Sequence, residues 1–240
     1  MDGATGSELD RRGINCNVPL WGANANLTDP DALKAVHRDY LINGAKAVTT
    51  NTFSTNKRRL DKSGLGHLDY KLTKTGVEMA VQARDEINPD AVVLGCVAPN
   101  DSCYNHHLVN DDYALRNEHR RHMSNLLKAG SDYILIETQK SARESIVAAE
   151  VAEELAPGRW AITWSVPTET IGILRCGTPL ADIIGKFKKA AFIGINCIDG
   201  RDVTAQIKHL RSISPKRMRI AAYGNIGVWY PPKDYQAGVK

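Results

Sequence analysis

SDYILIETQKSARESIVAAEVAEELAPGRWAITWS, residues 131–165, is the stretch that decides the fold. It begins with an apolar run at 133–137, continues with a segment of helical periodicity at 142–155, and ends with a second apolar run at 160–164. Two short apolar runs joined by a helix of this length predict a strand–helix–strand unit with parallel strands. Gly158 supplies the stop signal between the helix and the second strand.

The same alternation runs along the rest of the chain. It predicts parallel strands at 47–51, 91–97, 133–137, 160–164, 191–196 and 220–223. It predicts helices at 28–43, 69–87, 111–129, 142–155, 179–190 and 201–213. The first of these helices is expected to have Thr28 as its cap, Pro30 in its first turn and Gly44 at its end.

An open doubly wound sheet and a (β/α)8 barrel both agree with this alternation. Neither G-x-G-x-x-G nor G-x-x-x-x-G-K-[ST], the usual marks of a nucleotide-binding open sheet, occurs in the chain. Polar or reactive residues instead follow most strands, at the ends that converge on the mouth of a barrel: Thr50, Asn51, Thr52, Cys96, Glu137, Ser165, Asn196, Cys197 and Asn225. We therefore predict an α/β fold of the (β/α)8 TIM-barrel type, formed by a single domain over residues 1–240.

The number of strands differs from that of a closed barrel. Six strands and a stub that ends at Asp2 and Gly3 make seven, so we expect the barrel to be incomplete at both ends, with its last strand missing. An open barrel leaves exposed strand edges, which favour self-association into a homo-oligomer.

Composition excludes several classes of protein. With 42% hydrophobic and 24% charged residues, the chain is neither disordered nor collagen-like. No apolar run approaches the roughly 18 residues of a membrane span, and no secretory signal is visible, so we expect a cytoplasmic protein. Five cysteines without regular spacing favour reduced thiols over a disulfide framework.

Basic residues are concentrated toward the end of the chain. Residues 183–240 hold 11 Lys and Arg against 3 Asp and Glu, although the whole chain has a net charge of only +4. These basic residues are scattered through helix-like segments without interleaved aromatic residues, which is typical of solvated helix faces. We expect neither nucleic acid nor a membrane as a partner.

Two acidic residues are candidates for binding a ligand. Asp2 and Gly3 lie where the first strand would turn into its loop, so the glycine lets a ligand approach the backbone and the carboxylate suits an ammonium group. A plain turn is the alternative. Glu137 ends an apolar strand and is therefore either paired in a structural salt bridge or functional, as an ammonium ligand or a general base.

Thiols and loop aromatics form a second group of candidates. Cys197 ends the strand at 191–196, where a cysteine is more often a small buried residue than a metal ligand. Cys96, Cys103, His106 and His107 lie within reach of the same mouth but show no recognisable ligand spacing. Loop aromatics either pack on the barrel rim or surround a cation: Trp21, Phe53, Tyr104 and Trp229.

Taken together, these motifs resemble the homocysteine S-methyltransferase family over essentially the whole chain. They are DGATGSEL at 2–9, LWGANANLTDPDALKAVHRDYLINGAKAVTTNTF at 20–53, VAP at 97–99, ILIET at 134–138, CGTPLADI at 176–183, GINC at 194–197, and YGNIG at 223–227 as a variant of the family's Pro-Asn-Ala-Gly segment. The resemblance implies a (β/α)8 barrel that uses Zn²⁺, bound through three cysteines, to move a methyl group from a sulfonium or quaternary ammonium donor to the thiol of homocysteine, giving methionine.

The resemblance also implies roles for individual residues. Cys197 matches the first zinc ligand. Homocysteine would be contacted by Asp2, Gly3, Phe53, Glu137 and Asn196, with Glu137 on its amino group, and Trp21 matches a residue that surrounds the methyl donor. Ser54 stands where betaine-using members carry a further aromatic residue, which counts against betaine as the donor.

One departure from the family concerns the metal. The other two zinc ligands of the family are an adjacent cysteine pair in a GGCCG-type motif on the last strand, which this sequence lacks. Three accounts stay open: a fragment of an active enzyme, a short homologue with other ligands, and a degenerate metal-free barrel that binds an amino acid or a methylated cation without methyl transfer. An unrelated barrel enzyme with Glu137 as its base is a further alternative.

Overall fold

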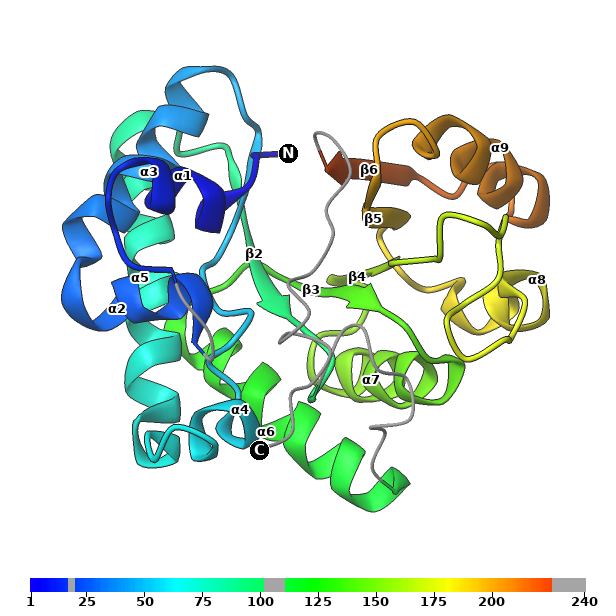
Figure 1. Cartoon of the computed structure of the whole chain (residues 1–240), viewed down its shortest axis with the longest axis horizontal. Helices are drawn as coiled ribbons and strands as arrows, with labels where there is room; N and C mark the ends of the chain where they lie inside the picture. Colours follow the sequence, from blue (N-terminus) through cyan, green and yellow to red (C-terminus); the bar gives the residue numbers. More distant parts are fainter. Residues whose placement is uncertain (17–19, 102–110, 226–240) are drawn as a thin grey trace.

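The structure, a computed structural model, describes residues 1–16, 20–101 and 111–225. Its core is a six-stranded parallel sheet in the order β1-β2-β3-β4-β5-β6. The strands are β1 (Ala47–Thr49), β2 (Val92–Val97), β3 (Tyr133–Gln139), β4 (Trp160–Trp164), β5 (Ile193–Asp199) and β6 (Ile220–Asn225). The sheet curls into a half-barrel with the helices around its outside (Figure 1). The prediction of an incomplete (β/α)8-type barrel is confirmed for the described residues, as are all six predicted strands.

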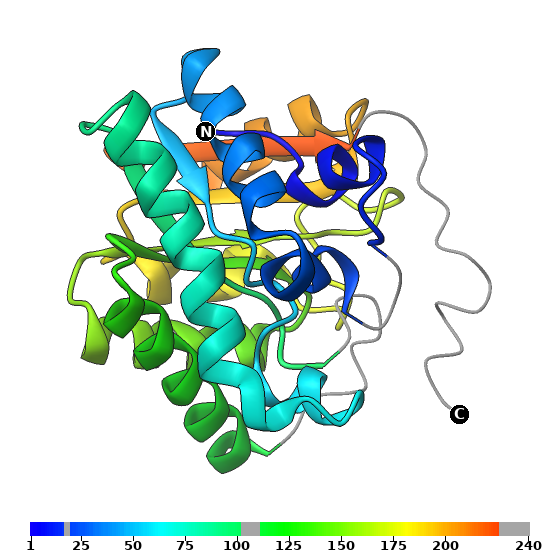
Figure 2. The same ribbon diagram turned by 90° about the vertical axis from the view of Figure 1, so that its left-hand side faces the viewer.

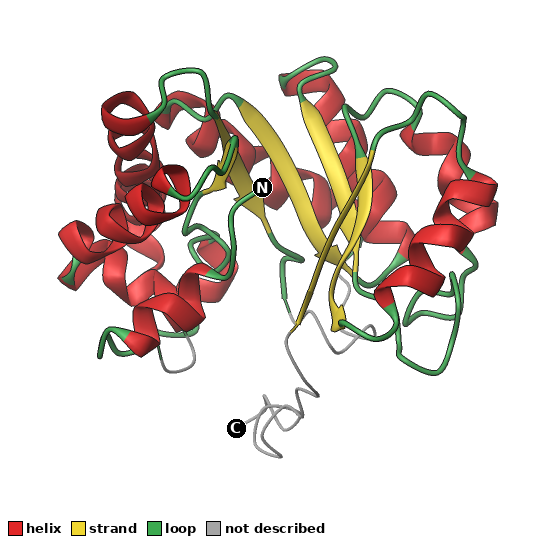
Figure 3. Cartoon of the chain, turned by 90° about the horizontal axis from the view of Figure 1, so that it is seen from above, coloured by secondary structure: helices red, strands yellow, loops and turns green. Residues whose placement is uncertain are grey.

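Helices connect the strands along the outer face. The longer ones are α3 (Pro30–Ile42), α5 (Asp69–Ile87), α6 (Asp112–Ala129), α7 (Ala142–Leu155) and α9 (Val203–Ile213). The shorter ones are α1 (Thr5–Arg11), η1 (Trp21–Asn24), α2 (Ala25–Thr28), α4 (Lys57–Asp61), η2 (Gly66–Leu68), α8 (Leu180–Ile183) and η3 (Ile184–Phe187). Seen from above, the strands run between two groups of helices (Figure 3).

The predicted cap of one helix and the whole of another predicted helix are wrong. Thr28 is the last residue of α2 rather than the cap of α3, whose N-cap is Asp29, followed by Pro30. The helix predicted at 179–190 is replaced by the short α8 and η3, and Gly185 lies within the second of them. Glycine weakens a helix interior by about 1 kcal/mol relative to alanine, which disfavours a continuous helix there.

The hydrophobic core lies between the sheet and its outer helices. Trp160 and Trp164 of β4 are fully buried, and the Trp164 ring meets Phe187 edge to face at a centroid distance of 5.1 Å. The indole nitrogen of Trp164 donates to Ser145 Oγ of α7 at 3.1 Å. Apolar side chains thus fill the space between the sheet and its outer helices, and polar residues lie at the carboxyl ends of the strands.

The predicted N-terminal stub lies beside β1. The Asp2 backbone N–H donates to Ala47 O at 2.9 Å, but no strand is formed there. The N-terminal segment and β6 lie on the same side of the molecule in both Figure 1 and Figure 2. Among the described residues, no helix combines the length and apolar character that crossing a membrane requires.

Candidate functional site at the carboxyl ends of the strands

The site is built on two irregular strand ends. The pairing of β3 with β4 shifts register between Ile136 and Gln139, and that of β5 with β6 shifts between Asn196 and Asp199. Within these irregular segments, Thr138 has φ +59° and Cys197 has φ +53°. A left-handed conformation costs a residue other than glycine about 1–2 kcal/mol, and such strain is concentrated at functional sites.

Thr138, Asn196 and Cys197 hold the two irregular ends together. Asn196 is completely buried, accepts a hydrogen bond from Thr138 N at 3.0 Å and donates one to Thr138 Oγ1 at 2.8 Å. Thr138 Oγ1 lies 3.7 Å from Cys197 Sγ, and Asn196 Nδ2 lies 3.3 Å from the same sulfur. These bonds stabilise the strained backbone and hold the Cys197 thiol against Thr138 and Asn196.

Glu137 lies at the centre of this arrangement. Its carboxylate oxygen Oε2 accepts a hydrogen bond from Tyr223 Oη at 3.0 Å and lies 3.4 Å from Asn196 Nδ2. The Cys96 thiol, from β2, also hydrogen-bonds to this carboxylate. Burial raises the pKa of Glu137, and the bonds from Cys96 and Tyr223 oppose that rise. No cation pairs with Glu137 among the described residues, so a structural salt bridge does not explain it there.

Asp2 provides a second carboxylate close to Glu137. Its oxygens accept hydrogen bonds from Thr49 N at 2.6 Å and Thr49 Oγ1 at 3.0 Å, which attach it to β1. Burial, together with the nearby charge of Glu137, raises the pKa of Asp2 to about 7 although both Thr49 bonds oppose the rise. A Cβ on the following Gly3 would lie only 2.7 Å from the Tyr40 hydroxyl.

Phe53, in a loop, and Trp21, at the start of a short helix, lie in segments tied to the same end of the sheet. Thr52 Oγ1, beside Phe53, donates to Cys96 O at 2.9 Å. Trp21 begins η1 with φ +53°, and Asn51 Nδ2 donates to the carbonyl of the next residue, Gly22, at 2.6 Å. Both rings are partly buried, whereas Tyr104 and Trp229 lie outside the described residues.

The thiols of the described residues do not make a zinc site. Catalytic zinc takes three protein ligands. In residues 1–16, 20–101 and 111–225, no three His, Cys, Asp or Glu side chains form a group that could hold a metal ion. Cys96 is buried and hydrogen-bonded to Glu137, so Cys197 offers one ligand without the other two. Cys103, His106 and His107 lie outside the described residues.

Two residues of the site, Tyr223 and Thr138, are not individual candidates in the sequence, where they occur only within the YGNIG and ILIET motifs. Cys96 is a candidate as a strand-end residue and a metal ligand, but its contact with Glu137 is not predicted. Their contact with Glu137 and Asn196 depends on how far the sheet curls. The position of each at a strand end was the only signal that sequence carried.

Comparison with known proteins matches this geometry to one family. The family model described as Homocysteine S-methyltransferase matches residues 1–238. Homocysteine S-methyltransferase of Escherichia coli (strain K12) is 30% identical over 251 residues, which cover 96% of this chain and 78% of that protein. Homocysteine S-methyltransferase YbgG of Bacillus subtilis (strain 168) is 27% identical over 253 residues, covering 97% and 79%.

Solved structures agree with the sequence relatives. The metallated form of the homocysteine methyltransferase MmuM from Escherichia coli is similar with a TM-score of 0.85 and 28% identity, covering 95% of this chain and 83% of that one. The apo form of the same protein gives a TM-score of 0.73 at 28% identity, covering 94% and 81%.

Proposed function

This chain belongs to the homocysteine S-methyltransferase family, and on that premise we propose that it moves a methyl group from a sulfonium or quaternary ammonium donor to the thiol of homocysteine, giving methionine. The observation that carries the proposal is the buried Glu137 carboxylate, which has no cation partner among the described residues and is held by Tyr223 at 3.0 Å on the irregular end of β3 near Cys197.

Glu137 and Asp2 bind the amino group of homocysteine in this proposal. Glu137 is buried, Asp2 is partly buried, both carboxylates have raised pKa values, and neither has a positively charged side chain paired with it among the described residues. An α-ammonium group supplies that charge, favours the ionised form of both carboxylates, and accounts for two acids at one site. Asn196 and Tyr223 keep the Glu137 carboxylate oriented toward the ligand.

The reaction itself needs positioning more than proton transfer at a protein group. The homocysteine thiol loses its proton to solvent, and its sulfur then attacks the methyl carbon of the donor in line with the breaking bond. The electron pair of that bond returns to the donor's sulfur or nitrogen, which becomes neutral. Holding the sulfur and the methyl group in line supplies the proximity contribution, and aromatic faces such as Trp21 stabilise the donor's positive charge.

The proposal includes zinc as a cofactor. When bound, zinc lowers the pKa of a coordinated thiol and so keeps the substrate as thiolate. Cys197 would supply one ligand, and the further ligands would have to come from outside the described residues. The binding and positioning roles described above for this chain's own residues do not depend on these further ligands.

A methyl-transfer assay tests the proposal. The 240-residue chain is incubated with homocysteine and either S-methylmethionine or betaine, with and without added zinc, and methionine is measured by mass spectrometry. We expect methionine from at least one donor, and Glu137→Gln to remove most of the turnover. Glu137→Asp, which keeps the charge, serves as the matched variant and is expected to retain more activity than Glu137→Gln.

The absence of a three-ligand metal group among the described residues supports a second candidate. A barrel that binds an amino acid or a methylated cation without transferring a methyl group keeps Asp2 and Glu137 but needs no metal. Binding of methionine by calorimetry with no turnover from any donor favours this candidate over the first. A chain that shows neither binding nor turnover would contradict both candidate functions.

A further inference from the structure

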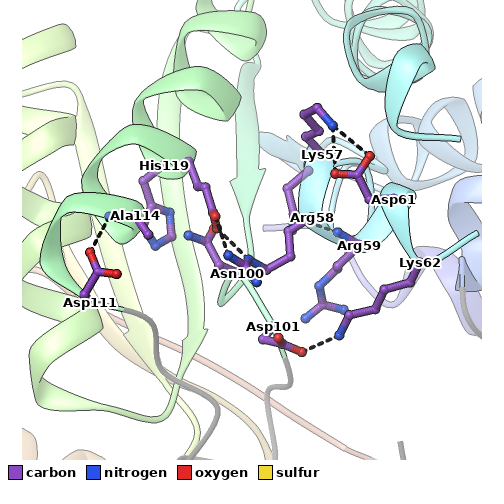
Figure 4. Close-up of polar contacts among 12 residues, drawn as sticks. Lys57, Arg58, Arg59, Asp61, Lys62, Asn100, Asp101, Asp111, Ala114 and His119 are labelled. Carbon is purple, nitrogen blue, oxygen red and sulfur yellow. Dashed lines mark hydrogen bonds and ion pairs between the residues drawn. The ribbon is translucent and has the colours of Figure 1, made fainter. Parts of the chain in front are cut away.

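Four cationic side chains lie on or beside α4, and three of them are paired with acids. Lys57 bonds to Asp61 at 2.7 Å, Arg58 to Glu118 at 2.6 Å, and Lys62 to Asp101 at 2.6 Å. Figure 4 shows the first and third of these pairs. The fourth is Arg59, which has no carboxylate within ion-pair distance among the described residues.

Arg59 is also the most buried of the four. It is only 9% exposed, and its guanidinium carbon lies 5.0 Å from the centroid of the Phe53 ring. Nη2 donates to Pro99 O at 3.1 Å, while Nε is buried without an acceptor in the described part of the chain. A buried guanidinium held by one neutral carbonyl and one aromatic face lacks the negative charge that offsets its desolvation.

A second donor without an acceptor follows Pro99 in the chain. Asn100 is 2% exposed, and its side-chain nitrogen Nδ2 has no hydrogen-bond partner among the described residues. Residues 102–110, SCYNHHLVN, contain no Asp or Glu that could neutralise Arg59. Two buried donors, on Arg59 and on the residue that follows its partner Pro99, thus have no acceptor among the described residues, and the guanidinium also lacks a negative charge there.

Arg59 belongs to the same end of the sheet as the two carboxylates. Its charge acts on the Cys96 thiol, which hydrogen-bonds to Glu137. Phe53, on which the guanidinium lies, is one of the residues predicted to contact homocysteine. Glu137 and Arg59 thus provide a negative and a positive group for one zwitterionic ligand.

We propose that Arg59 binds the carboxylate of an amino-acid substrate in this site, with the Asn100 amide as an additional donor. The inference rests on the proposed function, because homocysteine and a methylated amino-acid donor both carry a carboxylate. A carboxylate bound to Arg59 would leave the ammonium group to Glu137 and Asp2 and set the direction in which the side chain enters. Arg59 is a specificity-determining residue in this arrangement and takes no part in the transfer step.

Removing the carboxylate from the ligand tests the pairing directly. Binding of L-homocysteine and of 3-aminopropane-1-thiol, which is homocysteine without its carboxylate, is measured by calorimetry for the wild type, Arg59→Met and Arg59→Lys. We expect the wild type to prefer homocysteine by about 10- to 100-fold, because a charge-assisted contact is lost with the analogue. In Arg59→Met this preference disappears, and in Arg59→Lys part of it is retained. Arg58→Gln, on the same helix, is the matched control and should keep the preference.

The KM values for homocysteine and for the donor show whose carboxylate is bound. If Arg59→Met raises KM for homocysteine alone, Arg59 binds the carboxylate of homocysteine. If it raises KM for the donor alone and leaves homocysteine binding unchanged, Arg59 binds the carboxylate of the donor. Equal losses for both thiols in Arg59→Met, with no rise specific to the donor, would show a structural role and overturn the proposal. The proposal would also be overturned if the wild type bound both thiols equally well and Arg59→Met left KM for the donor unchanged. A preference that depends on Arg59 in a chain that transfers no methyl group supports the role of Arg59 and contradicts the proposed function.

Discussion

The Tyr223 hydroxyl donates a hydrogen bond to Glu137 Oε2 at 3.0 Å, although β6 and β3 are separated in the sheet by β4 and β5. In a flat sheet, strands three places apart would lie about 14 Å from each other, beyond the reach of this contact. Curling of the half-barrel brings the two side chains together on its inner side. The contact therefore measures the curvature that the proposed site requires.

Loss of that contact should weaken substrate binding. Tyr223→Phe removes one donor from Glu137 and leaves the aromatic ring in place, so the carboxylate ionises less readily. We expect KM for homocysteine to rise about 3- to 10-fold, since a single hydrogen bond contributes roughly 1 kcal/mol. Steady-state kinetics measure the effect, with the exposed Tyr113→Phe as a control that should change nothing. An unchanged KM in Tyr223→Phe would argue against Glu137 as the residue that binds the ammonium group.

Ligand binding should depend on pH through Asp2. The pKa of Asp2 is about 7, so its carboxylate is increasingly ionised as pH rises through that value. Only the ionised form attracts an ammonium group. Methionine, which carries no thiol of its own, should therefore bind more tightly at pH 8 than at pH 6, by up to about tenfold per pH unit below pH 7. Calorimetry over this range checks the direction.

Asp2→Asn is the control for that pH dependence. The amide accepts a hydrogen bond from Thr49 as the carboxylate does, but it does not titrate. We expect weaker methionine binding and a flatter profile between pH 6 and pH 8. A profile in Asp2→Asn as steep as in the wild type would assign the titration to another group, with Glu137 the next to test.

Zinc retention should reflect the ligands available in the described part of the chain. Since no three His, Cys, Asp or Glu side chains among the described residues form a group that could hold a metal ion, we expect the purified chain to lose its zinc on dialysis against a mild chelator. Elemental analysis under reducing conditions measures zinc per chain, beside a Cys197→Ser control. About one zinc per chain that survives dialysis and is lost in the control would contradict this expectation and reveal ligands outside the described residues.

Gly194 should be essential for the packing of β5 against β6. A Cβ at this position would lie 2.4 Å from the Ala221 carbonyl oxygen and 2.9 Å from Thr163 Cγ2, so the backbone would have to move. We expect Gly194→Ala to lower the free energy of unfolding by about 1–3 kcal/mol. Gly6→Ala in α1, where nothing lies within 4 Å of the added carbon, should leave stability unchanged or raise it. Denaturant unfolding of both variants provides the comparison.

Much of the architecture could be predicted because its signals are local. The six strands, α5 and α7 follow from apolar periodicity within single segments, and α5 and α7 begin and end at the predicted residues. The prediction of a helix at 179–190 is wrong because the weak helical periodicity there does not outweigh an interior glycine and packing against the neighbouring strands. Candidate site residues at strand ends were predictable as a group, since parallel strands direct those ends to one side.

Sequence by itself determined the order of strands and helices, the family, and the presence of Glu137, Asn196 and Cys197 near the ends of strands. Only the tertiary structure decided that Tyr223, 86 residues from Glu137, reaches its carboxylate, and that Arg59 is the buried cation without an acid. Apolar periodicity is written into each segment, whereas hydrogen bonds across the half-barrel depend on the curl of the whole sheet and on the two irregular strand ends. Burial then sets the pKa values, because the same carboxylates in an unfolded chain would remain in water.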